Sequence, residues 1–352
     1  MKKFLAFILA VVMMFACAAC GGSGAAQSSK EPEPPATEKV DYTNGDAYTI
    51  KIGHVSQDGV PADVMCDEIG EKLSEITGGR ITVQVFPASQ LGNNTEQLEQ
   101  LQFGSLEMCL SSVAFLGGFT DSTMLLDLPY LFKNEAAAEE VLDGEVGQAM
   151  FASLEEAGFH GLCWVSTGWR HVTANTEIHS PADMAGLKIR VMENEMHIAH
   201  FNALGASAIP MAFSELYTAL QQGTIDCQEN PWANIDGTRL YEVQKYIIET
   251  GHIYDTAPIL ASSVWWDSLS ETDQELIQSV IMECLAAERE LSKTNQDELR
   301  DKIGGNGSNV VIQLTDEERQ AFRDAAQSVY DTYGEKIGQD LIDMVDEINA
   351  RH

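Results

Sequence analysis

Hydrophobic and polar residues follow two alternating patterns along the chain from Tyr48 onward. A period of two, typical of strands, covers residues 48–54, 81–85 and 106–110, and a helical period covers 64–76 and 96–103. The first helix is expected to end at Gly78, because glycine readily adopts the left-handed conformation that terminates helices. Strands and helices in this order are typical of βαβ units, so the pattern predicts an α/β fold.

The same alternation begins again in the second half of the chain. Helices are predicted over residues 135–157, 195–204 and 214–222, and strands over 161–166, 187–192 and 224–228. Two α/β units in series predict a crevice between them. Such crevices favour ligands, because strand ends and domain surfaces meet there.

A further helix is predicted to be long. Apolar residues form a stripe over residues 276–285, and Ser270 with Asp273 provides a capping pair at its start. The helical pattern continues past Leu291, which makes this helix long enough to bridge two domains.

The N-terminus carries an export signal, in which a basic start precedes an apolar run over residues 4–16 that is too short to span a membrane. Cys20 follows two alanines and resembles the lipidated cysteine of a bacterial lipobox, although Cys17 stands where lipoboxes usually carry Leu. This predicts a lipoprotein signal peptide over 1–19 and lipidation of Cys20, with plain secretion as the alternative. A redox or metal CxxC pair is disfavoured, because both cysteines lie in a segment expected to be removed or modified. Gly, Ser, Ala, Pro and Glu dominate the next residues and predict a flexible tether over 20–45.

Composition narrows the class of partner. The chain has 21 Lys and Arg against 54 Asp and Glu, a formal net charge of −33, which disfavours nucleic acid. An organic acid is compatible with this charge, because exposed charges are screened beyond about 8–10 Å at physiological salt and a buried arginine acts locally. Five cysteines beyond the tether are predicted to be buried thiols without a disulfide framework: Cys66, Cys109, Cys163, Cys227 and Cys284.

Several linked motifs over residues 179–253 resemble the DctP family of TRAP transporter solute-binding proteins. They are Ala185-Gly-Leu-Lys-Ile-Arg190-Val, Leu204-Gly-Ala, the run from Met211 to Gly223, Asp226-Cys-Gln-Glu-Asn230-Pro231 and Tyr241-Glu-Val-Gln-Lys245, with Phe86-Pro-Ala-Ser-Gln-Leu-Gly92 and Leu128-Pro-Tyr130-Leu upstream. The resemblance implies a two-lobed periplasmic-binding-protein-like fold with crossing strands and a long helix that spans both lobes. It places lobe one at 46–167 plus 256–295 and lobe two at 168–255 plus 296–352, which close on a ligand like a hinged trap.

The resemblance also implies a function. It predicts an exported, monomeric receptor, anchored by its lipid to the outer face of the cytoplasmic membrane, without cofactor or metal and without catalytic activity. Its ligand would be a small organic acid, such as a uronate or other sugar acid, a C4-dicarboxylate or a keto acid, which it delivers to a small and a large TRAP membrane subunit. The chain itself carries no information on the ion that drives such transport.

Three residues match the family's carboxylate-binding positions. Arg190 is the expected clamp, since a guanidinium offers two parallel hydrogen bonds to a carboxylate and stays charged when buried. Arg170 falls where a second arginine often lies, and the alternative is a structural pairing with a neighbouring acid. Asn230 matches an amide that reaches the ligand, and the alternative is a turn before Pro231.

Further residues fall on or near family positions that line the cleft. Phe213, His54, Val55, Ser111 and Ser112 match such positions, and Glu193, Asn194 and Trp232 lie close enough to the motifs to be wall candidates. At Ser112 some sugar-acid binders of the family carry Glu, so their ligand cannot be assumed for this chain.

Other functions have less support. The sequence after the tether contains no GxSxG, HExxH, P-loop or GxGxxG motif, which disfavours the familiar enzyme classes. His197 and His200 share one face of a predicted helix, but no acid or cysteine cluster joins them as metal ligands. The main alternative is a binding protein of another importer class or of a membrane-bound sensor, since both would keep the same cleft chemistry.

Overall fold

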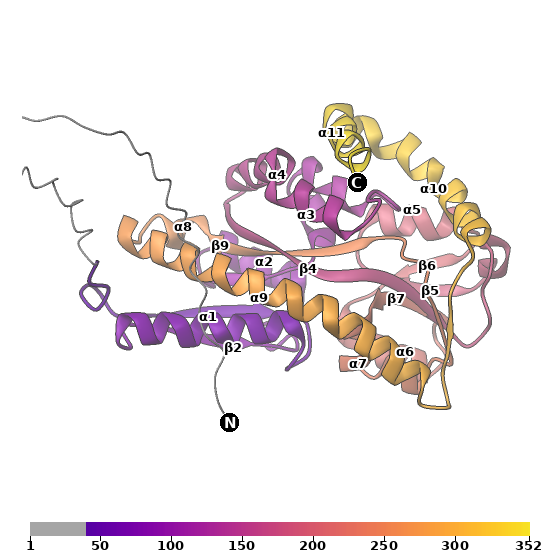
Figure 1. Cartoon of the computed structure of the whole chain (residues 1–352), viewed down its shortest axis with the longest axis horizontal. Coiled ribbons are helices and arrows are strands. Elements are labelled where there is room, and N and C mark those ends of the chain that lie inside the picture. Colours follow the sequence, from indigo (N-terminus) through magenta and orange to yellow (C-terminus); the bar gives the residue numbers. More distant parts are fainter. Residues whose placement is uncertain (1–39) are drawn as a thin grey trace, which may run out of the picture. The chain divides into compact units, whose positions relative to one another are not determined.

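Two long strands, β4 (Phe159–Ala174) and β9 (Tyr254–Ser262), run antiparallel through the middle of the fold (Figure 1). The computed structural model describes residues 40–352, of which 41–352 form one compact unit. The predicted signal peptide, Cys20 and most of the predicted tether lie outside the described residues. β4 changes partner along its length: it pairs with β9 up to Trp169 and with β7 (Cys227–Pro231) from Arg170 onward.

β4 therefore belongs to both halves of a ten-stranded sheet. In the first half β1 (Tyr48–His54) runs parallel to β2 (Ile81–Phe86) and β3 (Met108–Leu110), and β9 runs antiparallel to β3 and β4. The second half contains β7 and the parallel strands β5 (Lys188–Val191) and β6 (Ser207–Pro210), while β8 (Tyr246–Ile248) connects β4 to β10 (Val310–Ile312).

Helices cover both faces of each half, as buried parallel strands require. The α-helices are α1 (Pro61–Thr77), α2 (Asn94–Gln102), α3 (Glu135–Asp143), α4 (Glu145–Glu156), α5 (Glu195–Ala203), α6 (Leu216–Gln221), α7 (Trp232–Gly237), α8 (Ser263–Trp266), α9 (Glu271–Gly304), α10 (Asp316–Ile337) and α11 (Gln339–Asn349). Short 3-10 helices are η1 (Val113–Gly118), η2 (Asp121–Asp127), η3 (Pro181–Met184), η4 (Phe213–Glu215) and η5 (Leu240–Glu242). Apolar residues of α1 and α9 pack on one face of the first half and those of α2, α3 and α4 on the other. In the second half, α5 and α10 face α6, α7 and the end of α9 across the strands.

The long helix predicted from the apolar stripe is α9, with 34 residues. Its N-cap is Ser270, whose side chain accepts a hydrogen bond from the backbone N–H of Asp273. The helix contacts α1 and β4 in the first half of the fold and α7 and β10 in the second, and Figure 1 shows it in orange along both halves. The predicted α/β class, the crossing strands and the long bridging helix are thus all confirmed.

Two local predictions need correction. The helix expected over 135–157 is two helices, α3 and α4, because Gly144 adopts an extended backbone (φ −93°, ψ −161°) between them. The strand expected to end at Ser166 continues to Ala174. Polar residues follow Ser166 and conceal the strand, but pairing with β7, β8 and β9 buries them.

The residue boundaries of the two lobes stay a prediction. The last helix, α11, packs with α3 and α4 through Ile342, Val345 and Ile348. Asn349 holds this end in place, because its Nδ2 donates to the carbonyl of Leu131 at 2.8 Å. The predicted boundaries assign α11 to lobe two and α3, α4 and Leu131 to lobe one, although α11 packs against them.

The five cysteines in the described part of the chain are free and buried, as predicted. Burial raises the pKa of Cys284 to about 11, which keeps this thiol protonated at neutral pH. Within residues 40–352, no helix combines the length and the apolar character that crossing a membrane requires.

One acid on α9 is buried without a cation. Glu288 is 2% exposed, accepts a hydrogen bond from Ser292 through Oε1, and has no partner for Oε2 among the described residues. Burial, only partly offset by Ser292 and Arg289, raises the pKa of Glu288 from 4.5 to about 7. As pH rises, Glu288 therefore loses its proton at a lower pH in the unfolded chain than in the folded protein. Its contribution to stability falls between about pH 4.5 and 7 and stays low above pH 7.

We predict that Glu288→Gln stabilises the protein above pH 7 and has little effect near pH 4.5, because Gln keeps the Ser292 hydrogen bond without a charge. The pKa difference corresponds to roughly 3 kcal/mol at most. Melting temperatures of wild type and variant across pH 4.5–8 measure this. Glu290→Gln, on the exposed face of α9, is the control and should show no such pH-dependent gain. Equal curves for wild type and Glu288→Gln would contradict the prediction.

Candidate ligand-binding site

A narrow cavity lies where β4 changes partner, at the carboxyl ends of β1, β3 and β5. Its lining residues come from both halves of the sheet: Val55, Ser56, Asn94, Leu110, Ser112, Phe115, Thr167, Arg170, Arg190, Met192, Phe213, Asn230, Asn234, Asp255 and Ala257. The volume of the cavity, measured as the space open to the centre of a water molecule, is ≈ 40 Å³. One water needs roughly 10–15 Å³ by this measure. The cavity as it stands has room for a few waters or a small polar group.

Arg190 is the charged group in this cavity that forms no ion pair with any residue that the structure describes. It is the residue before the last of β5, is 1% exposed, and donates from Nε to the carbonyl oxygen of Met211 at 2.9 Å. Its Nη1 is buried and has no hydrogen-bond partner among residues 40–352. Burial lowers the pKa of Arg190 to about 10, with Glu229 acting against the shift, so the side chain is still charged at neutral pH. A buried, charged donor without an acceptor is costly and favours the binding of an anion.

Arg170 lines the same cavity but is fully paired. Its Nη1 lies 3.0 Å from Oδ2 of Asp255 on β9, and its Nε and Nη2 form a fork on the carboxylate of Glu229 on β7. Burial opposes its charge, yet Glu229 and Asp255 raise the pKa of Arg170 above the ordinary value. Glu229 responds in the opposite way: despite its burial, Arg170 and His252 hold the pKa of Glu229 well below the usual range. The structural ion pairing that sequence analysis left open for Arg170 is present.

Asn230 also lies at the cavity and belongs to the same network. Its Oδ1 accepts hydrogen bonds from Nη2 of Arg170 and Nδ2 of Asn234, each at 3.3 Å, and its Nδ2 donates to Gln228. The two long bonds are weak, so the amide has capacity for a ligand atom. Asn230 is thus oriented by its neighbours on β7 and α7.

Three of the predicted wall residues line the cavity: Val55, Ser112 and Phe213. The guanidinium carbon of Arg190 lies 5.9 Å from the centre of the Phe213 ring, within cation–π range. The hydroxyl of Ser112 is 3.5 Å from Oδ1 of Asp255, a marginal hydrogen bond that a ligand oxygen can replace.

The other five wall candidates do not line it. His54 is buried with its Nε2 3.0 Å from Oδ1 of Asp63, and the Ser111 hydroxyl donates to Asn94 at 3.0 Å. Asn194 caps α5 and donates to Ala114 and Asp127, and Glu193 is exposed. The ring of Trp232 lies beside His171, with centroids 5.7 Å apart.

Sequence analysis missed the two acids that decide the charge of the site, Glu229 and Asp255. Glu229 stands next to Asn230 in the Asp226–Pro231 motif. Its position beside a predicted ligand-binding residue was the sequence signal that could have indicated its role. Asp255 lies in β9, all nine residues of which are buried. Thr167 on β4 donates a short hydrogen bond to Asp255 and fixes the orientation of this carboxylate.

The described residues contain no group of three or more His, Cys, Asp and Glu side chains that would hold a metal ion. His197 and His200 have other roles: Nε2 of His197 lies 3.0 Å from Asp127, and His200 stacks on His252 with centroids 5.6 Å apart. Burial lowers the pKa of His200 well below the usual value, so it is neutral.

Crossing strands, a bridging helix and a buried arginine that has no counter-ion among the described residues define a binding protein for a small anion. Comparison with known proteins gives the family. Residues 52–336 match the family model for DctP, "bacterial extracellular solute-binding protein, family 7", and the chain belongs to this family.

Relatives and solved structures agree with this assignment. The 2,3-diketo-L-gulonate-binding periplasmic protein YiaO of Escherichia coli is 33% identical over 86% of this chain and 92% of its own length. A TRAP periplasmic solute-binding protein from Shewanella oneidensis with bound succinate superposes with a TM-score of 0.84 at 30% identity, covering 86% of this chain and 99% of that one. The sugar acid binding protein DctPAm from Advenella mimigardefordensis with galactonate has the same TM-score and identity over 88% and 99%. The family resemblance and the two-lobed fold expected from it are confirmed.

We predict that Glu229→Gln destabilises the protein by about 3–5 kcal/mol, because it leaves the buried guanidinium of Arg170 with only one of its two acids. Chemical denaturation with a fluorescence readout measures the change in unfolding free energy. Glu193→Gln removes an exposed carboxylate next to the site and is expected to shift stability by less than about 0.5 kcal/mol. An equal loss of unfolding free energy in both variants would contradict the prediction that the Arg170–Glu229 ion pair stabilises the fold.

Proposed function

We propose that this protein is an exported receptor that captures a small organic acid through Arg190 and delivers it to the membrane subunits of a TRAP transporter. The observation that carries the proposal is the buried Nη1 of Arg190, a charged donor with no acceptor in the described structure. Membership of the solute-binding family and similarity to TRAP proteins with bound acids support it.

In this proposal the two oxygens of the ligand carboxylate accept hydrogen bonds from Nη1 and Nη2 of Arg190, whose Nε is already bonded to Met211. Arg170 and Asn230 contribute position and hydrogen bonds, since Glu229 and Asp255 already balance the Arg170 charge. Phe213 covers the guanidinium on one side and excludes water, which strengthens the ion pair.

Charge balance favours one class of acid. Arg170, Arg190, Glu229 and Asp255 together carry no net charge. A ligand with one carboxylate therefore adds a single negative charge to the cavity region. A second carboxylate on the same ligand would add another negative charge, and these four residues provide no further cation for it. Ser112, Asn94 and Asn234 offer neutral hydrogen-bonding groups elsewhere on the wall. Such a wall suits hydroxyl or carbonyl groups, which favours a sugar acid or keto acid over a C4-dicarboxylate.

The remaining parts of the proposal concern assembly. The signal peptide over 1–19 is removed, Cys20 carries lipid on the outer face of the cytoplasmic membrane, and 20–45 is a tether. The monomeric receptor closes two lobes, 46–167 plus 256–295 and 168–255 plus 296–352, on its ligand and binds it without chemical change. Similarity to TRAP structures favours this transporter class over another importer or a sensor.

We expect that one class of carboxylic acids raises the melting temperature of the refolded, ligand-free domain, and that Arg190→Gln abolishes this. The panel contains uronates and other sugar acids, keto acids, C4-dicarboxylates, amino acids and neutral sugars. A ligand at about 100 times its Kd adds roughly 2.7 kcal/mol of stability, which is readily measured. Monocarboxylic sugar or keto acids are expected to stabilise more than succinate.

Lys188→Gln is the matched control, because it removes an exposed cation from the same strand, two residues before Arg190. Acid binding that survives Arg190→Gln, or stabilisation by neutral sugars alone, would contradict the carboxylate clamp. Succinate as the strongest ligand would contradict only the charge-balance argument and leave the clamp intact. Turnover of a bound acid would contradict the receptor function.

We further expect that Cys20→Ala moves the expressed protein from the membrane fraction to the soluble fraction. Cys17→Ala is the matched control and should remain in the membrane fraction, since it changes only a residue of the removed signal. Fractionation of cells that express each variant, followed by immunoblotting, measures this. Soluble wild-type protein would support plain secretion instead.

A further inference from the structure

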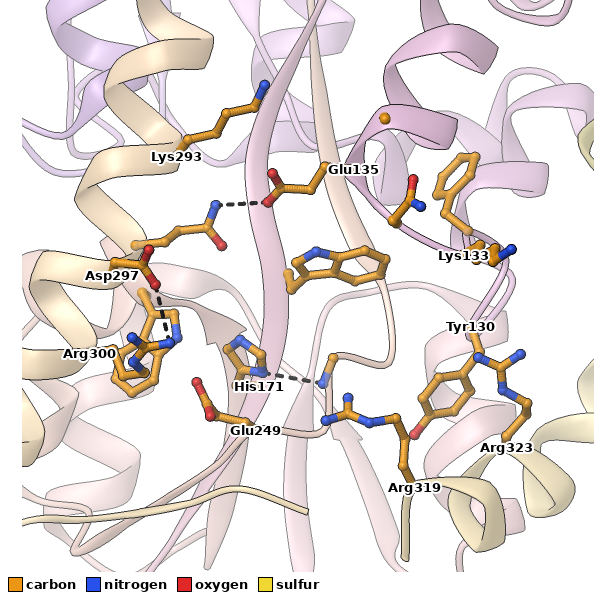
Figure 2. Close-up of a pocket in the computed structure, with 17 residues that line it drawn as sticks. Tyr130, Lys133, Glu135, His171, Glu249, Lys293, Asp297, Arg300, Arg319 and Arg323 are labelled. Carbon is orange, nitrogen blue, oxygen red and sulfur yellow. Dashed lines mark hydrogen bonds and ion pairs between the residues drawn. The ribbon is translucent and has the colours of Figure 1, made fainter. Parts of the chain in front are cut away.

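A second cavity lies on the face of β4 opposite to the ligand site. Side chains alternate between the faces of a strand, so Arg170 points into the ligand site while Trp169 and His171 line the second cavity. Figure 2 shows this cavity between α9, the start of α3 and the start of α10. Its volume of ≈ 780 Å³ falls within the usual range of small-molecule sites.

This cavity is lined by several cations, although the chain as a whole has a formal net charge of −33. Lys133, Lys293, Arg300, Arg319 and Arg323 line the cavity, against three acids. Lys293 pairs with Glu139 at 3.0 Å and Arg300 with Asp297 at 3.1 Å. In the described residues, Lys133, Arg319 and Arg323 form no ion pair. Of the three acids, Glu249 acts electrostatically on both Arg300 and Arg319. The α10 side of the cavity therefore keeps an excess of positive charge that Glu249 offsets only in part.

The two arginines of α10 are four residues apart and so share one face of the helix. Arg319 donates from Nη1 to the carbonyl of Thr250 at 3.2 Å, and its other N–H groups remain available. A Cβ on Gly251, which has φ +52°, would lie 3.1 Å from that Nη1, so the missing side chain leaves room for the guanidinium. The guanidinium of Arg323 lies over the ring of Tyr130, 5.4 Å from its centre.

Tyr130 adds a third donor. It is 7% exposed, and its hydroxyl has no hydrogen-bond partner among the described residues. Burial raises the pKa of this hydroxyl, so it is a donor at neutral pH. Its backbone has φ +58°, a conformation that costs free energy for a bulky residue and that recurs at functional sites. In Figure 2 the Tyr130 ring lies between Arg319 and Arg323.

This side of the cavity offers hydrogen-bond donors and an excess of positive charge, which Glu249 offsets only in part. His171 does not change the balance, since burial lowers its pKa to about 3 and it is neutral. Guanidinium groups fit the oxygens of phosphates and carboxylates, and two neighbouring arginines suit a ligand with more than one negative charge.

We propose that the cavity behind β4 is a second binding site, which holds a small multivalent oxyanion between Arg319, Arg323 and the hydroxyl of Tyr130. The site is separate from the Arg190 clamp and does not depend on the proposed function.

Isothermal titration of the mature domain with inorganic pyrophosphate, and in a second arm with citrate, tests this at fixed ionic strength. Pyrophosphate binding is expected in wild type and in Arg190→Gln. It should weaken at least about tenfold in the double variant Arg319→Gln/Arg323→Gln, and several-fold in Tyr130→Phe, which removes only the hydroxyl. If citrate binding weakens in the same variants as pyrophosphate binding, polycarboxylates are also ligands of this second site. If citrate binding is lost only in Arg190→Gln, citrate occupies the Arg190 clamp, and the ligands of the second site are phosphates.

Lys336→Gln is the control, since it removes a cation from the same helix outside the cavity. It should change pyrophosphate affinity by less than about twofold. No binding by folded wild type, loss of binding in Arg190→Gln, or equal weakening in Lys336→Gln would each overturn the proposal. Tyr130→Phe and Arg323→Gln alone keep the test informative if the double variant does not fold, because each removes one group from the cavity.

Discussion

The ion pairs of Arg170 with Glu229 and Asp255 hold together the strands on which the binding site is built. Arg170 lies on β4 where this strand leaves β9 for β7, Asp255 lies on β9, and Glu229 on β7. All three side chains are buried, and a buried charge is tolerated only when it is paired. The network therefore fixes the point at which one strand passes from the first half of the sheet to the second.

This network also explains why Arg190 is free to bind a ligand. Two arginines and two acids meet in one region, yet both acids face Arg170 and neither forms an ion pair with Arg190. Nε of Arg190 is held by the carbonyl of Met211, which orients the guanidinium without neutralising it. The site is thus preorganised, because its donor is already desolvated and in place before an anion arrives.

The strongly acidic surface and an acidic ligand are compatible for the same reason. Exposed carboxylates are screened by salt, whereas Arg190 is buried and acts on a ligand at short range. The second cavity follows this principle on the other face of β4, where Arg319 and Arg323 form no ion pair within residues 40–352 and Glu249 offsets only part of their charge. Alternation of side chains along β4 separates the two sites, although Trp169, Arg170 and His171 are neighbours in sequence.

Local pattern determined much of the fold. The predicted strand over 48–54 is β1, Gly78 with φ 62° ends α1, and Ser270 begins α9, because alternation, helix period and capping depend on residues close in sequence. The linked motifs also placed Arg190, Arg170, Asn230 and Phe213 at one cavity. Tertiary structure alone decided what each of them does there. The sequence of β9 has no polar face that would indicate the role of Asp255. The two acids that pair with Arg170 come from strands that are distant in sequence. Only the folded chain therefore shows that Arg170 is neutralised and Arg190 is not.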